Sequence, residues 1–322
     1  MKSLTNNTTD NNAYAEAALL TTLRKSEWTG KTKATDLDRK IAAENDADAK
    51  STKTDKFLVT NDEPLWRALR KAGRDLHSVW EQWSSPGQDG GTRMIASWTW
   101  SEFAARVEAK AEHFNECVEA FCADYENIIK RQAPRLGKLF NATDYPAPVD
   151  IRRKFGVTVD YMPVPTTDDF RIKLSKEQMD KVRESTQRAV ESALVRAARD
   201  PWKRMHGLVE KVIGTLSQPD KIFRDSMVNN IRQLCEMMPA LNVMKDKGLE
   251  EITDRIQKEL VTLDTAAMRD PKWKQVGHAG YDRSLAAQAN RAEAKTKAQS
   301  ILDRMDELMA VSYTHLRAHE TD

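Results

Sequence analysis

The sequence has few of the features that mark membrane, secreted or strongly charged proteins. Only three cysteines occur among 322 residues, and none belongs to a C-x-x-C pair, so neither a disulfide framework nor a zinc ribbon is expected. Mean hydropathy is −0.67, and no apolar run approaches the roughly 20 residues that a membrane-spanning helix needs. The 51 basic and 49 acidic residues leave a formal charge of +2, which argues against a polyanion-coating tail. A reducing cytoplasm is expected.

The two ends of the chain are predicted to lie outside the fold. Residues 1–12 are rich in Asn and Thr and lack an apolar core, which predicts a disordered leader and no secretory signal. Residues 311–321 read VSYTHLRAHET, which resembles the in-frame translation of a transposase-type sequencing-library adaptor. We therefore expect 311–322 to be an artefact that continues no helix, and the natural C-terminus to be missing. The His315-x-x-x-His319 spacing is set aside for the same reason.

The pattern of apolar residues predicts a mostly α-helical protein. The clearest helix covers 103–128, where apolar residues recur in steps of three and four along one face. Such a stripe needs a partner helix to cover it. Further helices are expected at 13–24, 61–83, 148–155, 176–216 with a break or kink at Pro201, 222–238, 249–263 and 283–309.

A small β-structure is expected beside these helices. Residues 157–161 and 170–174 alternate apolar and polar side chains and predict an antiparallel hairpin, with 94–100 as a further strand. Residues 31–55 are almost wholly polar and predict a linker or a surface helix. The expected fold is mostly α with a small antiparallel sheet. The expected divisions are 1–12 leader, 13–60 short helix and linker, 61–175 long helix plus hairpin, 176–310 helical bundle, and 311–322 artefact.

Patterns that would indicate catalysis or metal binding are weak. The histidines before residue 311 stand far apart, and only His113 has a potential ligand at helical spacing, Cys117. The Gly-rich stretch 86–93 lacks the spacing of a phosphate-binding loop and fits a tight turn better. Asp144, Asp168 and Asp169 could hold Mg²⁺ for a nuclease, but aspartates are common in turns. We expect no catalytic residue, cofactor or metal.

A basic segment between residues 128 and 154 is the most specific candidate site. Seven cations occur there against two aspartates, with Phe140 and Tyr145 interleaved. Cations contact phosphates and aromatic rings stack on bases, so a nucleic-acid surface is one interpretation and a solvated face the other. The candidate residues are Lys130, Arg131, Arg135, Lys138, Arg152, Arg153 and Lys154.

Five blocks of residues point to one family. They are Trp28-Thr29-Gly30; Asp89-x-Gly91-x-Arg93; Gly137-x-Leu139-Phe140-x-x-x-Asp144-Tyr145-Pro146; Ile151-Arg152 with Lys154-Phe155; and Pro163-Val164-Pro165-x-x-x-Asp169-Phe170-Arg171-Ile172. In order and spacing the chain resembles, over about 27–310, an uncharacterised family of tailed-bacteriophage proteins. It departs from that pattern where Pro-Trp is expected before Asp89. The resemblance implies a phage protein encoded near DNA-metabolism genes, and no assigned activity.

The preferred functional hypothesis is a non-enzymatic phage protein in the host cytoplasm that acts by helix-mediated assembly or partner binding. The stripes at 103–128 and 285–309 predict an elongated shape or a homo-oligomer, with another protein as the other possible partner. The alternative is a DNA-binding accessory of phage replication or recombination, and a metal-dependent nuclease is a third possibility. No membrane partner is expected.

Overall fold

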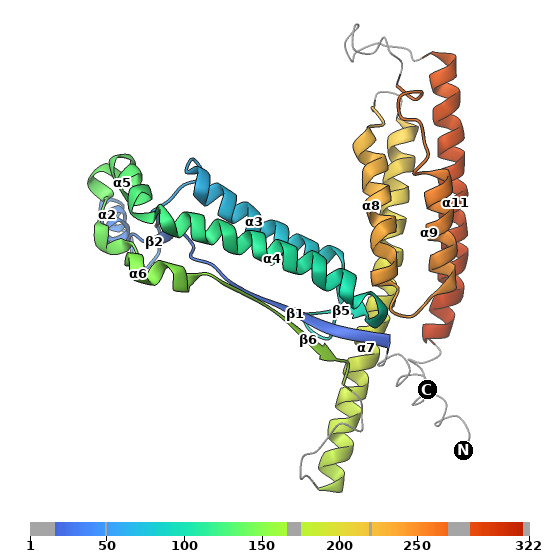
Figure 1. Cartoon of the computed structure of the whole chain (residues 1–322), viewed down its shortest axis with the longest axis horizontal. Helices are drawn as coiled ribbons and strands as arrows, with labels where there is room; N and C mark the ends of the chain where they lie inside the picture. Colours follow the sequence, from blue (N-terminus) through green and yellow to red (C-terminus); the bar gives the residue numbers. More distant parts are fainter. Residues whose placement is uncertain (1–16, 49, 166–174, 219–220, 270–283, 318–322) are drawn as a thin grey trace. The chain divides into compact units, whose positions relative to one another are not determined.

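The computed structural model describes residues 17–48, 50–165, 175–218, 221–269 and 284–317 (Figure 1). It is 67% helical with a small antiparallel sheet, which confirms the predicted mostly α class. The residues group into two compact units, each assembled from separate stretches of chain. Unit 1 comprises 1–22, 82–103 and 161–322, and unit 2 comprises 23–81 and 104–160. Residues 1–12 and 170–174, which carry the predicted leader and second hairpin strand, lie outside the described residues.

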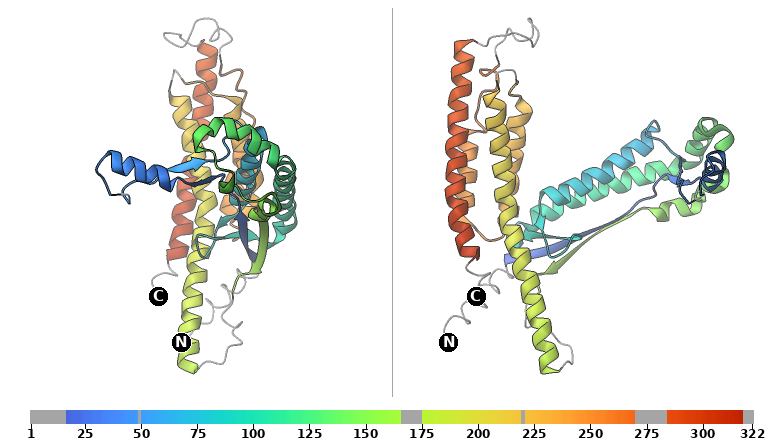
Figure 2. Two further views of the ribbon diagram at one scale, coloured as in Figure 1. Left: turned by 90° about the vertical axis from the view of Figure 1, so that its left-hand side faces the viewer. Right: turned by 180° about the vertical axis from the view of Figure 1, so that it is seen from behind.

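Unit 1 contains a bundle of four helices that lie side by side in every view (Figures 1 and 2). They are α7 (Lys176–Ser217), α8 (Asp225–Leu241), α9 (Lys247–Glu259) and α11 (Leu285–Arg317). Their apolar faces meet in one core, to which α7 contributes Met205, Val209 and Val212 and α11 contributes Ala298, Ile301 and Met305. The stripe predicted on the last helix is buried only in part, since Met305 is buried whereas Leu285, Ala289 and Ala292 are exposed.

The structure corrects two expectations about these long helices. Helix α7 runs through Pro201 as one continuous helix, so of the break or kink expected there the break is absent; Pro201 and the adjacent Trp202 are buried, and this packing compensates for the lost backbone hydrogen bond. Helix α11 ends at Arg317, so residues 311–317 do continue a helix. Helix α7 begins at the predicted residue 176, where Ser175 and Gln178 form a capping box.

A four-stranded sheet has the order β4 (Ser85–Pro86), β5 (Thr92–Ala96), β1 (Ala18–Ser26), β6 (Gly156–Pro163). The helix predicted at 13–24 is wrong, because residues 18–24 belong to strand β1. Leu20 lies opposite Met94 in an antiparallel register, and both side chains are buried against Val190 and Leu194 of α7. Strand pairing and burial here outweigh the helix propensity of the local Ala and Leu residues.

Unit 2 is built on two helices that lie side by side, α3 (Pro64–Gln82) and α4 (Trp100–Ala123) (Figure 2). The last residue of α3 and residues 100–103 of α4 belong to unit 1. Helix α5 (Tyr125–Leu136) and the short α6 (Pro148–Ile151) follow. The predicted stripe is present, since Val107, Phe114, Val118, Phe121, Tyr125 and Ile128 are all buried. This apolar face is therefore covered within the chain.

The polar stretch after Trp28 forms small elements at one end of unit 2. Strands β2 (Lys31–Lys33) and β3 (Asp55–Phe57) pair antiparallel. Helix α2 (Thr35–Glu44) lies between them, so of the linker or surface helix expected over 31–55 a surface helix is present at 35–44. Asp38 Oδ1 accepts a hydrogen bond from the Thr54 backbone N–H at 2.7 Å, which joins α2 to the segment just before β3. Among the described helices, none is long and apolar enough to cross a membrane.

Candidate ligand-binding pocket

An aromatic cluster in unit 2 centres on Trp28. Its indole ring lies 5.7 Å from the ring of Trp66 and 6.0 Å from that of Tyr125, both edge-on. Gly30 makes this arrangement possible, because its φ is +69° and a Cβ there would lie 2.6 Å from the Trp66 ring. The Trp28-Thr29-Gly30 turn therefore holds one large aromatic side chain against the helices while the chain turns away into β2.

Two tyrosine hydroxyls hold the loop between α5 and α6 against this cluster. The Tyr145 hydroxyl donates to the Leu58 carbonyl at 2.9 Å, and the Tyr125 hydroxyl donates to the Pro146 carbonyl at 3.1 Å. Burial raises the pKa of both tyrosines, so both remain neutral donors. Residues 143–147 are thereby fixed opposite the 27–32 segment.

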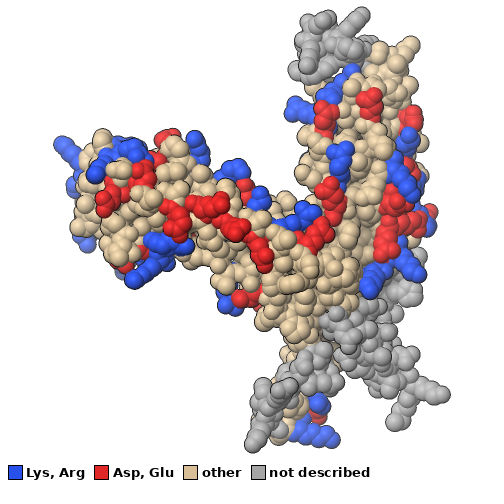
Figure 3. Space-filling model, viewed as in Figure 1, with Lys and Arg blue, Asp and Glu red and all other residues tan. Residues whose placement is uncertain are grey.

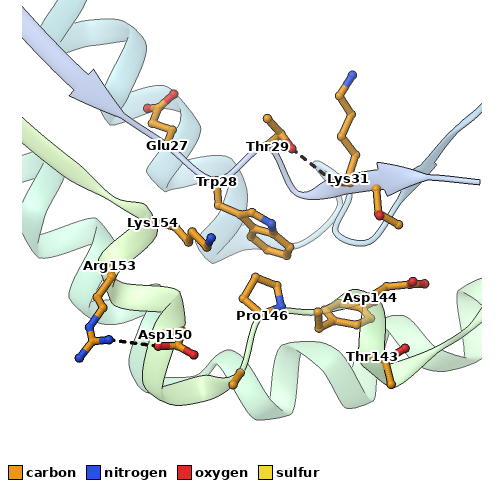
Figure 4. A pocket seen from close by; sticks show the side chains of 13 residues that line it. Glu27, Trp28, Thr29, Lys31, Thr143, Asp144, Pro146, Asp150, Arg153 and Lys154 are labelled. Carbon is orange, nitrogen blue, oxygen red and sulfur yellow. Dashed lines mark hydrogen bonds and ion pairs between the residues drawn. The ribbon is translucent and has the colours of Figure 1, made fainter.

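A pocket of about 650 Å³ lies between these two segments and α6 with the turn that follows it (Figure 4). Trp28 and Pro146 lie next to each other in this view, with Lys154 and Arg153 on one side, while Lys31 on the other side extends its ammonium away from the two rings. The remaining lining residues are Glu27, Thr29, Thr32, Thr143, Asp144, Tyr145, Ala147 and Asp150. The size falls in the range of small-ligand sites, and the lining combines aromatic rings with polar groups.

Carboxylates that line the pocket are paired with cations. Glu27 lies 3.1 Å from Lys25 and 3.0 Å from Arg70, measured between charged atoms. Asp144 is paired with Lys56, and Asp150 lies 3.4 Å from Arg153. These acids are therefore compensated and do not make the pocket acidic.

The pocket and its paired neighbours carry an excess of positive charge. One carboxylate, Asp55, serves both Lys31 and Lys33, and Lys154 forms no ion pair with any described residue. The lining residues alone carry three cations and three carboxylates and are net neutral, and with their ion-pair partners outside the pocket the total is seven cations against four carboxylates, a net charge of +3. The cations are Lys25, Lys31, Lys33, Lys56, Arg70, Arg153 and Lys154, and the anions are Glu27, Asp55, Asp144 and Asp150. Lys and Arg side chains gather at this end of unit 2, around α5, β2 and α6, with acidic side chains among them (Figure 3).

The Asp55 contacts predict an acid-sensitive strand pair. Hydrogen bonds from Lys31 and Lys33 lower the pKa of Asp55 to about 2 from 3.8. A carboxylate with a lowered pKa in the folded protein stabilises it above the unfolded pKa, and this contribution is lost as the pH falls from about 4 to 2. We expect β2–β3 pairing to loosen over that window, and Asp55→Asn to remove this pH dependence. NMR titration of the Asp55 carboxylate and the β2 amides measures both; an Asp55 midpoint near 4 would contradict the pairing.

The predicted basic residues are distributed over several environments in unit 2. Arg131 forms a bidentate pair with the buried carboxylate of Glu63, at 3.0 and 3.1 Å, and a second pair with Asp124 at 2.7 Å, which together raise the Arg131 pKa. Arg152 pairs with Glu119 on α4 at 2.6 Å. Arg131 thus links α5 to the residue before α3, and Arg152 links the turn after α6 to α4.

The other members of the basic segment carry more accessible charge. Arg135 donates to the Phe57 carbonyl at 2.6 Å and to a glutamine oxygen, neither of which is charged. Lys130 and Lys138 are exposed and form no ion pair with described residues. Arg153 and Lys154 line the pocket. The pocket thus combines two predicted cations with Trp28 and Lys31, to which composition had assigned no binding role.

The remaining sequence candidates have structural roles or stay isolated. In the Gly-rich turn, Asp89 Oδ1 accepts the backbone N–H groups of Gly91 and Thr92 at 2.9 and 2.7 Å, so these amides are occupied. His113 Nε2 lies 3.8 Å from Cys117 Sγ on the exposed face of α4. Within the described ranges, no three His, Cys, Asp or Glu side chains come together as metal ligands. Asp168 and Asp169 lie outside those ranges.

In comparisons with known proteins, no family model, characterised protein or solved structure matches this chain. Several blocks that carry the phage resemblance nevertheless meet in space. Trp28 of the first block, Asp144-Tyr145-Pro146 of the third and Lys154 of the fourth all line the pocket. The pocket is therefore where the distinctive segments of unit 2 converge.

Proposed function

We propose that the chain is a binding protein without chemistry of its own, and that unit 2 takes an anionic partner at the Trp28 pocket. The observation that carries this proposal is an aromatic-walled pocket of about 650 Å³ whose three lining carboxylates are each paired with a cation, which leaves the lining Lys154 without an ion pair among the described residues. Excess positive charge raises the local concentration of an anionic ligand, and fixed ion pairs hold the pocket in shape. The helical bundle of unit 1 would serve as a rigid structural module.

The resemblance supports a wider setting for this proposal, that of a tailed-phage protein acting in the host cytoplasm. Assembly with a second copy or another protein is the second candidate. It is favoured by exposed apolar side chains on unit 2, since Phe57, Leu139 and Val149 are 56, 51 and 74% exposed. Light scattering of the full chain distinguishes self-association from binding of a different partner.

The anion-binding proposal is tested by reversing the one pocket cation without an ion pair among the described residues. Lys154→Glu should weaken binding of a model polyanion such as heparin about tenfold at low salt, because it changes the charge within the pocket by two. Isothermal titration of the full chain measures this affinity.

Lys130→Glu is the matched control. Lys130 is also exposed and forms no ion pair with described residues, but it lies on α5 and does not line the pocket. An equal loss of affinity in both variants would show that binding follows overall charge and that the pocket is not the site. No polyanion binding by the unaltered chain would remove the proposal.

A further inference from the structure

The side chains that line the Trp28 pocket indicate which class of anion it binds. The Trp28 indole N–H forms no hydrogen bond with any described residue, although the ring is only 9% exposed. Figure 4 shows this indole at the pocket wall, next to Pro146. An unused N–H donor beside apolar ring surfaces suits a planar group that carries hydrogen-bond acceptors at its edge.

Charged and hydroxyl groups lie around this apolar part of the pocket. The Lys154 side chain extends toward Trp28, whereas the charged groups of Arg153 and Lys31 are paired with Asp150 and Asp55, and Thr32 and Thr143 add hydroxyl groups. Ammonium and guanidinium groups are the side chains that bind phosphate oxygens. The pocket therefore offers sites for a planar acceptor-bearing ring and for an anion next to it.

We infer that the pocket binds a nucleoside phosphate, with the base against Trp28 and Pro146 and the phosphate at Lys154. This inference rests on the proposed function and specifies its ligand. A nucleoside phosphate combines a planar ring and a phosphate in one unit, whereas an acidic peptide supplies the charge without a planar ring at a fixed distance from it. The unit could be a free nucleotide or one residue of a single strand, since their chemistry at the pocket is the same.

Filling the pocket without changing its charge tests the inference. Ala147 is exposed and lines the pocket, whereas the nearby Ala142 is also exposed and does not line it. Ala147→Trp should weaken binding of a fluorescent oligothymidylate of 15 nucleotides about tenfold, which is the effect of losing one base contact. Ala142→Trp should change it less than about twofold on the same scale. Fluorescence anisotropy with the full chain measures the affinities.

The salt dependence tests the phosphate contact separately. Lys154→Gln should lower the slope of log affinity against log salt by about 0.7 for a single strand, which corresponds to one phosphate contact. An unchanged slope would overturn the assignment of Lys154 to the phosphate. Thermal melting by circular dichroism confirms that each variant is folded, and Ala142→Trp shows whether a new surface tryptophan by itself disturbs the loop.

Further titrations distinguish the two ligand sources and the two proposals. Saturation by thymidine monophosphate, lost in Ala147→Trp, supports a free nucleotide, and binding of the oligonucleotide alone supports a strand. Oligonucleotide binding that is equal in Ala147→Trp and Ala142→Trp overturns the inference. If the chain binds an oligoglutamate peptide but no nucleotide, the nucleoside-phosphate inference is overturned. If Lys154→Glu abolishes that peptide binding, the proposed anion site stands. If neither ligand nor heparin binds, the proposed function fails as well.

Discussion

Phe121→Ala should lower the free energy of unfolding of unit 2 by about 3 to 5 kcal/mol, the usual cost of removing a fully buried phenylalanine. Phe121 is 0% exposed, and its ring lies 5.5 Å from Trp66, 5.6 Å from Tyr125 and 5.9 Å from Phe155. These rings come from α3, α5 and the segment after α6, so one deletion leaves a cavity where all of them meet. Urea unfolding measures the loss.

The same substitution should disturb the pocket, because Phe121 also lies 6.3 Å from Trp28. We expect a change in tryptophan emission under native conditions as Trp28 relaxes toward the cavity. Phe57→Ala is the control, since that ring is 56% exposed in the same unit and its removal should cost less than about 0.5 kcal/mol. A loss below about 1 kcal/mol for Phe121→Ala would mean that the cluster is loosely packed.

The part of the fold that could be predicted from sequence is the part determined by local periodicity. The steps of three and four between Phe103 and Ile128 identify a helix without knowledge of its partner, and that face is buried as expected. The helix predicted at 13–24 was wrong because the Ala and Leu composition of residues 18–24 suits a helix as well as a strand. These residues form a strand because they pair with β5 and are buried against α7.

The pocket could not be predicted because its residues come from distant parts of the chain. Trp28 and Lys154 each look ordinary in their local sequence, and they meet only because Tyr125 and Tyr145 hold the intervening loop in place. Likewise, a local count treats Arg131 as free charge, whereas its partner Glu63 is 68 residues away. The Trp28-Thr29-Gly30 turn and the Asp144-Tyr145-Pro146 block were conspicuous as motifs, but neither indicates a pocket by itself.

In the bundle of unit 1, Arg291→Met should lower the free energy of unfolding by about 2 to 4 kcal/mol, since charged hydrogen bonds are lost and buried carbonyls are left without that donor. Arg291 lies on α11 and is only 5% exposed. Its Nη2 donates to the carbonyls of Thr215, Leu216 and Gln218, at 2.8, 3.2 and 3.0 Å. These carbonyls end α7, where a helix has no intrahelical donors for them and a cation is favoured.

Arg304→Met on the same helix is the matched control for this effect. Arg304 is partly exposed and lies 3.0 Å from both Glu251 and Glu307, so its loss should cost about 0 to 1 kcal/mol, as for other surface ion pairs. Hydrogen exchange of the last turn of α7 should rise only in Arg291→Met, because only that variant removes the cap. Equal destabilisation by the two variants would indicate that Arg291 stabilises the bundle only as a surface cation would, and that the end of α7 is stable without the hydrogen bonds from Arg291. A large loss confined to Arg291→Met, with faster exchange at 213–217, would show that a buried arginine links α11 to the end of α7.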